Sequence, residues 1–367
     1  MGKRTRSVIA VAAVAVAVAV VMLITVGPWG RHLERPGKPP LGYLREPLGG
    51  RHYRVTAWTL GDTAAFNTAT AAQAVDEIDF DWYHSHRNGS VTADHENLNL
   101  VAAARAKNLN IFATVTNSEH AGGAFDHNVA AAIMATQITR RHFITNLVNL
   151  VEKKGFDGID LDWENLKADD RGRYSALVTE LAKALHAEGR FLSVAVFPKT
   201  TAEGSWGDQA AVDYKRIGAA CDEFKIMLYS FSGPWGEPGP QAPTAWADKV
   251  LNLAQQLVPA GKISMGVPFY GYDWHAGSVT PVTADDVMAA AKRANAGITR
   301  DPASNEAIVR YQDENGVDHV VYFQDQQALV AKIDLLRHLH PGLNGISIWE
   351  MGQQGAGFWD VIKSELK

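Results

Sequence analysis

The sequence has 367 residues, of which 46% are hydrophobic and 20% are charged. This balance is typical of a packed globular protein, and the length suits one large domain or two ordinary ones. The net charge of −5 provides no basic surface for nucleic acid. Cys221 is the only cysteine, which excludes an intrachain disulfide and a thiolate metal cluster.

The first elements in chain order are export signals. A basic segment, residues 1–7, precedes an uncharged apolar segment, residues 8–26. These 19 residues are close to the number that a helix needs to cross a bilayer. A cleaved signal peptide is the alternative, because the Ala-Val-Ala sequence at 17–19 has the small-x-small cleavage pattern. The apolar run continues beyond it, which favours an uncleaved signal anchor within residues 1–30. Both interpretations place the rest of the chain outside the cytoplasm.

A linker and then a folded domain follow. Residues 31–50 are rich in proline and glycine and predict a short linker. From residue 51 onward, short β-rich runs alternate with longer helical patterns. Strands are expected at 53–58, 78–83, 110–116, 158–163, 191–197, 223–229, 262–270 and 345–351. Helices are expected at 98–108, 138–155, 171–189, 246–258 and 326–339, where apolar residues recur at three- and four-residue spacing.

Eight strands alternating with helices over residues 51–367 predict an α/β fold, a parallel (β/α)8 barrel. A doubly wound open sheet is the structural alternative, but no glycine-rich phosphate-binding motif follows the first strand. The connection at about 273–325 is too long for a loop. It contains a helical pattern and then alternating apolar residues around Asn315-Gly316, which indicates a hairpin. We therefore expect a small α+β insertion after the seventh strand, forming one wall of a cleft.

The segment GFDGIDLDWENL, residues 155–166, places four acidic residues in an apolar strand. Side chains alternate along a strand, so Asp160, Asp162 and Glu164 share one face and the apolar residues share the other. In a barrel the apolar face meets the helices and the acidic row points into the interior. Glu164 comes last and is expected at the C-terminal mouth, where barrel enzymes have their active sites. Asp157 has the opposite parity.

Confining three carboxyl groups in an interior predicts that at least one stays protonated, because burial and like charge both disfavour ionisation. A carboxylic acid that is neutral at working pH is what a general acid requires. A solvated acidic edge is one alternative, and a calcium or magnesium site is another. Large apolar residues separate the acids, and carboxylates at every second strand position rarely converge on one ion. The pattern favours acid catalysis without a metal or another cofactor.

These residues resemble a known family. The sequence DGIDLDWE has the Asp-x-x-Asp-x-Asp-x-Glu pattern of glycoside hydrolase family 18, the chitinase-like barrels. IMLYS is similar to the sixth-strand Met-x-Tyr motif of that family, GVPFYGYDW to its seventh-strand motif and GISIWEM to its eighth-strand tryptophan. The resemblance covers most of residues 51–367. It is strongest to the bacterial spore-cortex-lytic N-acetylglucosaminidases.

The resemblance implies a role for each matching residue. Glu164 would protonate the glycosidic oxygen, while the acetamido oxygen of the substrate attacks the anomeric carbon. Asp162 would hold the acetamide N–H and stabilise the oxazolinium-like intermediate, and Asp160 would share a proton with Asp162. Tyr229 would hydrogen-bond the acetamide carbonyl, and Trp349 would form the floor of the sugar pocket. The outcome would be hydrolysis with retention. Spacing agrees, since inward positions lie about 6.6 Å apart and Asp162 is poorly placed as a nucleophile.

Further sugar contacts are expected from residues in or near these motifs. They are Met227, Asn117, Asp157, Tyr270 and Trp58. Two positions depart from the family pattern. Ser230 follows the tyrosine where the family usually has aspartate, and Glu350 follows the tryptophan where a neutral residue is commoner.

The sequence thus predicts an extracytoplasmic glycosidase, membrane-anchored through the N-terminal helix. It would cleave β-1,4 bonds next to N-acetylglucosamine in peptidoglycan or chitin-like glycans. The alternative is a non-hydrolytic, lectin-like glycan-binding protein of the cell envelope that uses the same cleft. The expected partners are an N-acetylglucosamine-containing polysaccharide and the membrane, not a nucleic acid.

Overall fold

The computed structural model describes residues 53–120 and 122–367. The predicted signal anchor and the whole of the predicted linker therefore lie outside the described residues. Within the described ranges, every helix is too short or too polar to cross a bilayer.

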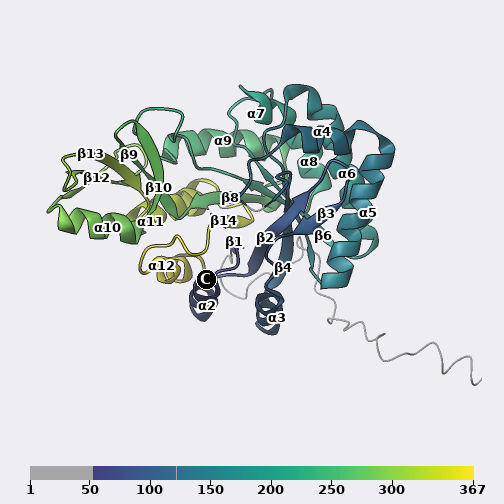
Figure 1. The fold of residues 1–367 in the computed structure, drawn as a ribbon, viewed down its shortest axis with the longest axis horizontal. Helices are drawn as coiled ribbons and strands as arrows, with labels where there is room; N and C mark the ends of the chain where they lie inside the picture. The colour runs from purple at the N-terminus through teal and green to yellow at the C-terminus, as the bar shows by residue number, and fades with distance from the viewer. Residues whose placement is uncertain (1–52, 121) are drawn as a thin grey trace, which may run out of the picture. The chain divides into compact units, whose positions relative to one another are not determined.

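A closed barrel of eight parallel strands forms the centre of the fold (Figure 1). Each strand hydrogen-bonds to the next, and the last pairs with the first, so the predicted barrel is confirmed and the open-sheet alternative is wrong. The short β3 (Val91–Ala93) extends β2 as an antiparallel hairpin. The barrel strands are β1 (Arg54–Thr59), β2 (Glu77–Ser85), β4 (Asn110–Thr116), β5 (Gly158–Asp162), β6 (Phe191–Val196), β7 (Glu223–Ile226), β8 (Ile263–Pro268) and β14 (Gly345–Trp349).

Helices connect the strands and cover the outside of the barrel. They are α2 (Thr63–Ala71), α3 (Leu98–Ala106), α4 (His127–Ala135), α5 (Gln137–Lys154), α6 (Arg171–Ala187), α7 (Gly207–Ala211), α8 (Tyr214–Ala220), α9 (Thr244–Leu257), α11 (Gln326–Asp334) and α12 (Phe358–Leu366). Local sequence sets their ends. In α5, Thr136 caps the first turn, and Gly155 ends the helix with a left-handed φ of 73°. Short single-turn helices lie at Ala168–Asp170, Ala260–Lys262 and Leu335–Leu339.

The predicted insertion is a five-stranded antiparallel sheet with one helix. Its elements are β9 (Tyr270–His275), β10 (Ser278–Thr283), α10 (Ala284–Arg293), β11 (Ile298–Arg300), β12 (Ala307–Gln312) and β13 (Asp318–Phe323). The β12–β13 hairpin turns at Asn315-Gly316 as expected, and Gly316 has a φ of 75°. The predicted seventh strand was too long. The barrel strand ends at Pro268, after which the Phe269 N–H still donates to the Trp349 carbonyl of β14, and Tyr270 already belongs to the second sheet.

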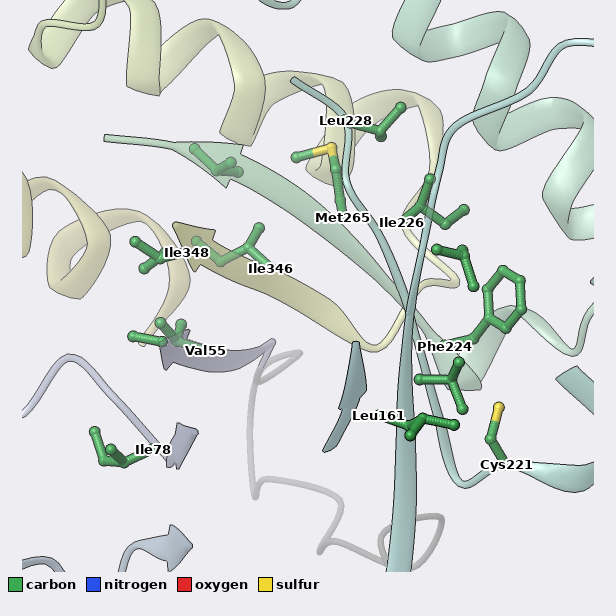
Figure 2. Packing of buried hydrophobic residues seen from close by; sticks show 14 of the residues in the cluster. Val55, Ile78, Leu161, Cys221, Phe224, Ile226, Leu228, Met265, Ile346 and Ile348 are labelled. Atoms are coloured by element: carbon green, nitrogen blue, oxygen red, sulfur yellow. The ribbon is translucent and has the colours of Figure 1, made fainter. Parts of the chain in front are cut away.

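The hydrophobic core lies between the barrel and the helices. Alternate strand residues supply it, and they are fully buried: Val55, Ile78, Leu161, Phe224, Ile226, Ile346 and Ile348 (Figure 2). Cys221 packs in the same layer, and burial raises the pKa of its thiol to about 12, as expected of a packing residue. The opposite faces of the same strands carry the polar residues that fill the barrel interior.

Candidate active site

The acidic row lies where strand alternation predicts. Asp160 and Asp162 are in β5, and Glu164 follows its C-terminal end. Asp160 is fully buried, Asp162 is buried and Glu164 is half-buried. Asp157 lies just before the strand, at the opposite end of the barrel, where its Oδ2 accepts a hydrogen bond from the Ile111 N–H at 2.9 Å. The structure therefore does not bring Asp157 into the site.

Asp160 is surrounded by hydrogen-bond donors from four other strands. Its Oδ2 accepts from Trp58 Nε1 at 2.8 Å and from Thr114 Oγ1 at 3.0 Å. Its Oδ1 accepts from Lys225 Nζ at 3.1 Å and from the Ser193 hydroxyl. Donors to both oxygens stabilise the ionised carboxylate.

Asp162 is in the opposite situation. It is 5% exposed, and its Oδ1 has no hydrogen-bond partner among the described residues. Burial raises its pKa well above the ordinary value, and the negative charges of Glu164, Asp160 and Asp81 raise it further. Asp162 therefore holds a proton to a higher pH than an ordinary aspartate does.

Glu164 is held by its backbone. Asn117, at the end of β4, accepts a hydrogen bond from the Glu164 N–H at 2.9 Å and donates one to the Glu164 carbonyl at 2.8 Å. Burial raises the pKa of the Glu164 carboxyl to about 8, with contributions from Asp208 and Asp81. The site thus holds a protonated carboxylic acid at the barrel mouth near neutral pH. Asn117 is fully buried, and both its side-chain oxygen and its side-chain nitrogen bond to the Glu164 backbone, so it positions Glu164.

Aromatic residues and one methionine lie beside the acids. Trp58 and Met227 are buried in one cluster, against which the partly buried Tyr229 and Trp349 pack. The rings of Trp58 and Trp349 meet edge to face, with centroids 5.8 Å apart. Tyr229 and Tyr270 make a similar contact at 6.2 Å.

The polypeptide around Tyr229 departs from the predicted strand. The strand β7 ends at Ile226 instead of residue 229, because the Leu228 and Tyr229 N–H groups bond to carbonyls only two residues back. Ser230 then adopts a left-handed φ of 58°, and its hydroxyl lies 2.7 Å from the Tyr270 hydroxyl. After these turns Tyr229 packs against the cluster of Trp58 and Met227.

The chemistry of the site is that of a carboxylic acid beside a pair of aspartates. Among the described residues, no group of three or more histidine, cysteine or acidic side chains could hold a metal ion. A model of the glycosyl hydrolases family 18 matches residues 67–354.

The chain belongs to glycoside hydrolase family 18. It is 27% identical over 314 residues to the uncharacterized glycosylase YvbX of Bacillus subtilis (strain 168), covering 84% of this chain and 90% of that protein. It is 29% identical over 291 residues to the cortical fragment-lytic enzyme of the same organism, covering 77% of this chain and 66% of that enzyme. The crystal structure of the Chromobacterium violaceum chitinase superposes with a TM-score of 0.79 at 27% identity, covering 86% and 99% of the two chains.

These findings confirm the predicted resemblance to family 18 and to its cortex-lytic members, and they make the chain a glycoside hydrolase. The family 18 barrel also contains functional candidates that the sequence reasoning missed. Burial raises the pKa of Asp81 and of Glu350 to about 7 each, and that of Asp208 to about 6. Asp81 could have been found, because Glu77, Asp79 and Asp81 alternate along β2 as the acids of β5 do.

The raised pKa of Glu164 makes stability depend on pH in a defined direction. A glutamate in the unfolded chain has its pKa near 4.5, and the folded value is about 8. The folded state therefore binds this proton more tightly, and the resulting stability is complete below pH 4.5 and lost as the pH rises through 8. We predict that wild type loses stability relative to Glu164→Gln as the pH rises from 4.5 to 8, because only the wild type has this proton to lose. Urea unfolding at a series of pH values measures this.

The matched control is Glu188→Gln, which removes an exposed glutamate at the end of α6. Its stability should follow the wild type at every pH. If the free energy of unfolding changes with pH in the same way in Glu164→Gln and in wild type, the Glu164 proton is not bound more tightly in the folded state.

Proposed function

We propose that this chain cleaves β-1,4 bonds next to N-acetylglucosamine, in peptidoglycan or chitin-like glycans, with retention of configuration and with the acetamido group of the substrate as nucleophile. The observation that carries the proposal is the Glu164 carboxyl at the barrel mouth, whose pKa burial raises to about 8, next to a buried Asp162 whose Oδ1 has no hydrogen-bond partner among the described residues. The names of the relatives support the substrate class, since they include a cortical fragment-lytic enzyme and chitinases.

In the first step, Glu164 transfers its proton to the glycosidic oxygen as the bond from the anomeric carbon breaks. The acetamido carbonyl oxygen of the same sugar attacks the anomeric carbon and forms an oxazolinium ring. Asp162 accepts a hydrogen bond from the acetamide N–H and stabilises the positive charge. The Tyr229 hydroxyl donates to the acetamide oxygen and orients it for attack.

In the second step, the Glu164 carboxylate takes a proton from water. The water oxygen attacks the anomeric carbon from the side that the leaving group has vacated, and the oxazolinium ring opens. Two inversions give net retention. Trp349 offers its ring as the floor under the sugar, and Met227 and Trp58 support that ring from below.

Removing the acid should slow turnover strongly. We predict that Glu164→Gln lowers kcat by about 10² to 10⁴, the usual contribution of a general acid, and leaves glycan binding in place. Mass spectrometry of the products from purified peptidoglycan and from chitin oligosaccharides, side by side, gives both the rate and the substrate class. Glu188→Gln, an exposed control, should match wild type. No release by either protein would favour a binding protein, and equal release by both would show that Glu164 is not the catalytic acid.

Retention is a separate prediction. The first product anomer should be β, with the α-anomer appearing only as mutarotation proceeds. Proton NMR of the anomeric region during early hydrolysis distinguishes the two. An initial α-anomer would mean that water attacks directly, which contradicts assistance by the acetamido group.

We also propose that residues 8–26 anchor the protein in the membrane and that the barrel lies outside the cytoplasm. The support is the length of this uncharged segment and the basic residues before it. The full-length chain expressed in a bacterial host should remain in the membrane fraction after a high-salt wash, and external protease should reach the barrel in spheroplasts. Release of a shortened chain into the medium would instead indicate a cleaved signal peptide.

A further inference from the structure

A single lysine occupies the centre of the barrel interior. Lys225 extends inward from β7 and is completely buried. Its ammonium contacts carboxyl groups from three strands. On β2 the contacts are with Asp79, which is the nearest of the four at 2.5 Å, and with Glu77 at 3.4 Å. The other two are Asp160 of β5 at 3.1 Å and Glu223 of β7 at 3.9 Å. The ammonium also lies 5.1 Å from the ring centre of Trp58. The other cation of this layer, Arg54 of β1, contacts Glu77 at 3.2 Å.

The carboxyl groups around Lys225 are not equivalent. Among the described residues, Asp79 has no hydrogen-bond partner for its Oδ1, and burial raises its pKa well above the ordinary value. Within the same residues Glu223 has none for its Oε2, and burial raises its pKa to about 8. Asp160 receives donors on both oxygens, three of them neutral and one the ammonium. Of these three carboxyl groups, Asp160 therefore accommodates a negative charge best.

The charge on Asp160 has a consequence for the reaction. Asp162 is the next inward residue of β5, and the negative charge of Asp160 helps to raise the pKa of Asp162. An ionised Asp160 thus keeps the proton on Asp162 before substrate binds. As positive charge develops on the sugar, that same anion stabilises it through Asp162.

We propose that Lys225 is a positioning residue for catalysis. Its ion pair with Asp160 makes Asp160 the ionised member of the pair Asp160 and Asp162. The proton that the two aspartates share before substrate binds then lies on Asp162. This rests on the function proposed above. Lys225 touches no substrate and acts only through Asp160. The alternative is a purely structural role, in which the ammonium neutralises the interior and its loss affects folding alone.

A double-mutant cycle separates the two roles. We expect Lys225→Met to lower kcat on a β-1,4-linked N-acetylglucosamine tetramer by about tenfold or more, with KM changed less than about twofold. Asp160→Asn removes the anion on which Lys225 acts. The double variant should therefore be no slower than Asp160→Asn alone, because residues that act as a unit are not additive. A double variant whose loss equals the product of the two single losses would overturn the proposal.

Lys332→Met is the matched control. Lys332 is also a buried lysine paired with a buried carboxyl group, Glu306, at 3.3 Å, but it lies in α11 and not in the barrel interior. Its loss should lower stability without a non-additive effect on kcat in the Asp160→Asn background. If Lys225→Met does not fold, the cycle is repeated in the Asp79→Asn background, which removes one carboxyl group that the lost ammonium leaves unpaired.

A second readout does not need turnover. In protein with ¹³C-labelled aspartate carboxyl groups, the Asp160 signal is identified by its absence from Asp160→Asn. This signal should titrate at a higher pH in Lys225→Met than in wild type, because the variant lacks the ammonium that favours the carboxylate. The same titration in wild type and in Lys225→Met would overturn the proposal even if the wild type hydrolyses glycans. If the wild type hydrolyses no glycan, the proposed function fails, while this measurement still decides the charge that Lys225 imposes.

Discussion

The contact between Lys225 and Asp160 is the interaction on which the interior of the barrel depends. Burying an ion is unfavourable unless a counterion and hydrogen bonds replace the lost water, and removing one partner of a buried pair costs about 3–5 kcal/mol. Here one ammonium contacts four carboxyl groups, and among the described residues only Asp160 of these four has donors on both oxygens. Burial is the largest cause of the raised pKa of Asp162, and the negative charge of Asp160 adds to it.

The same strand alternation that builds the core builds the site. In β5, Leu161 is buried against the helices, while Asp160 and Asp162 on either side of it face the interior. A shift of one residue would bury the acids against the helices and expose the apolar residues to the interior, so the packing energy of the core fixes the direction of the acids. The precision of the site therefore comes from the hydrophobic layer, and Asn117 adds the last constraint by holding the backbone of Glu164 where regular β-structure has ended.

Strand periodicity was enough to predict the barrel, the order of its strands and the inward row of acids, because these depend on a repeat of two residues. It failed where the backbone leaves that repeat. The predicted strand through Tyr229 ends early in two tight turns, and Tyr270 begins a second sheet instead of ending β8. Asp157 was grouped with the site because it belongs to the same motif, although it precedes the strand.

Other site features depend on contacts between strands far apart in sequence, which periodicity in one strand does not report. The role of Lys225 could not be predicted for this reason, since its partners on β2 lie about 150 residues away along the chain. Asn117 was assigned to sugar contact because it ends a strand at the mouth. That contact stays a prediction, and periodicity does not report the two bonds by which Asn117 also holds the backbone of Glu164.

The two departures from the family pattern both concern acidic residues near the mouth. Glu350 adds a buried carboxyl group whose pKa rises to about 7, through burial and through Asp81. An aspartate at position 230 would add another acid to a mouth that already holds Asp81, Asp162 and Glu164. Ser230 instead makes a neutral hydrogen bond to Tyr270, which ties the segment after β7 to the first strand of the insertion.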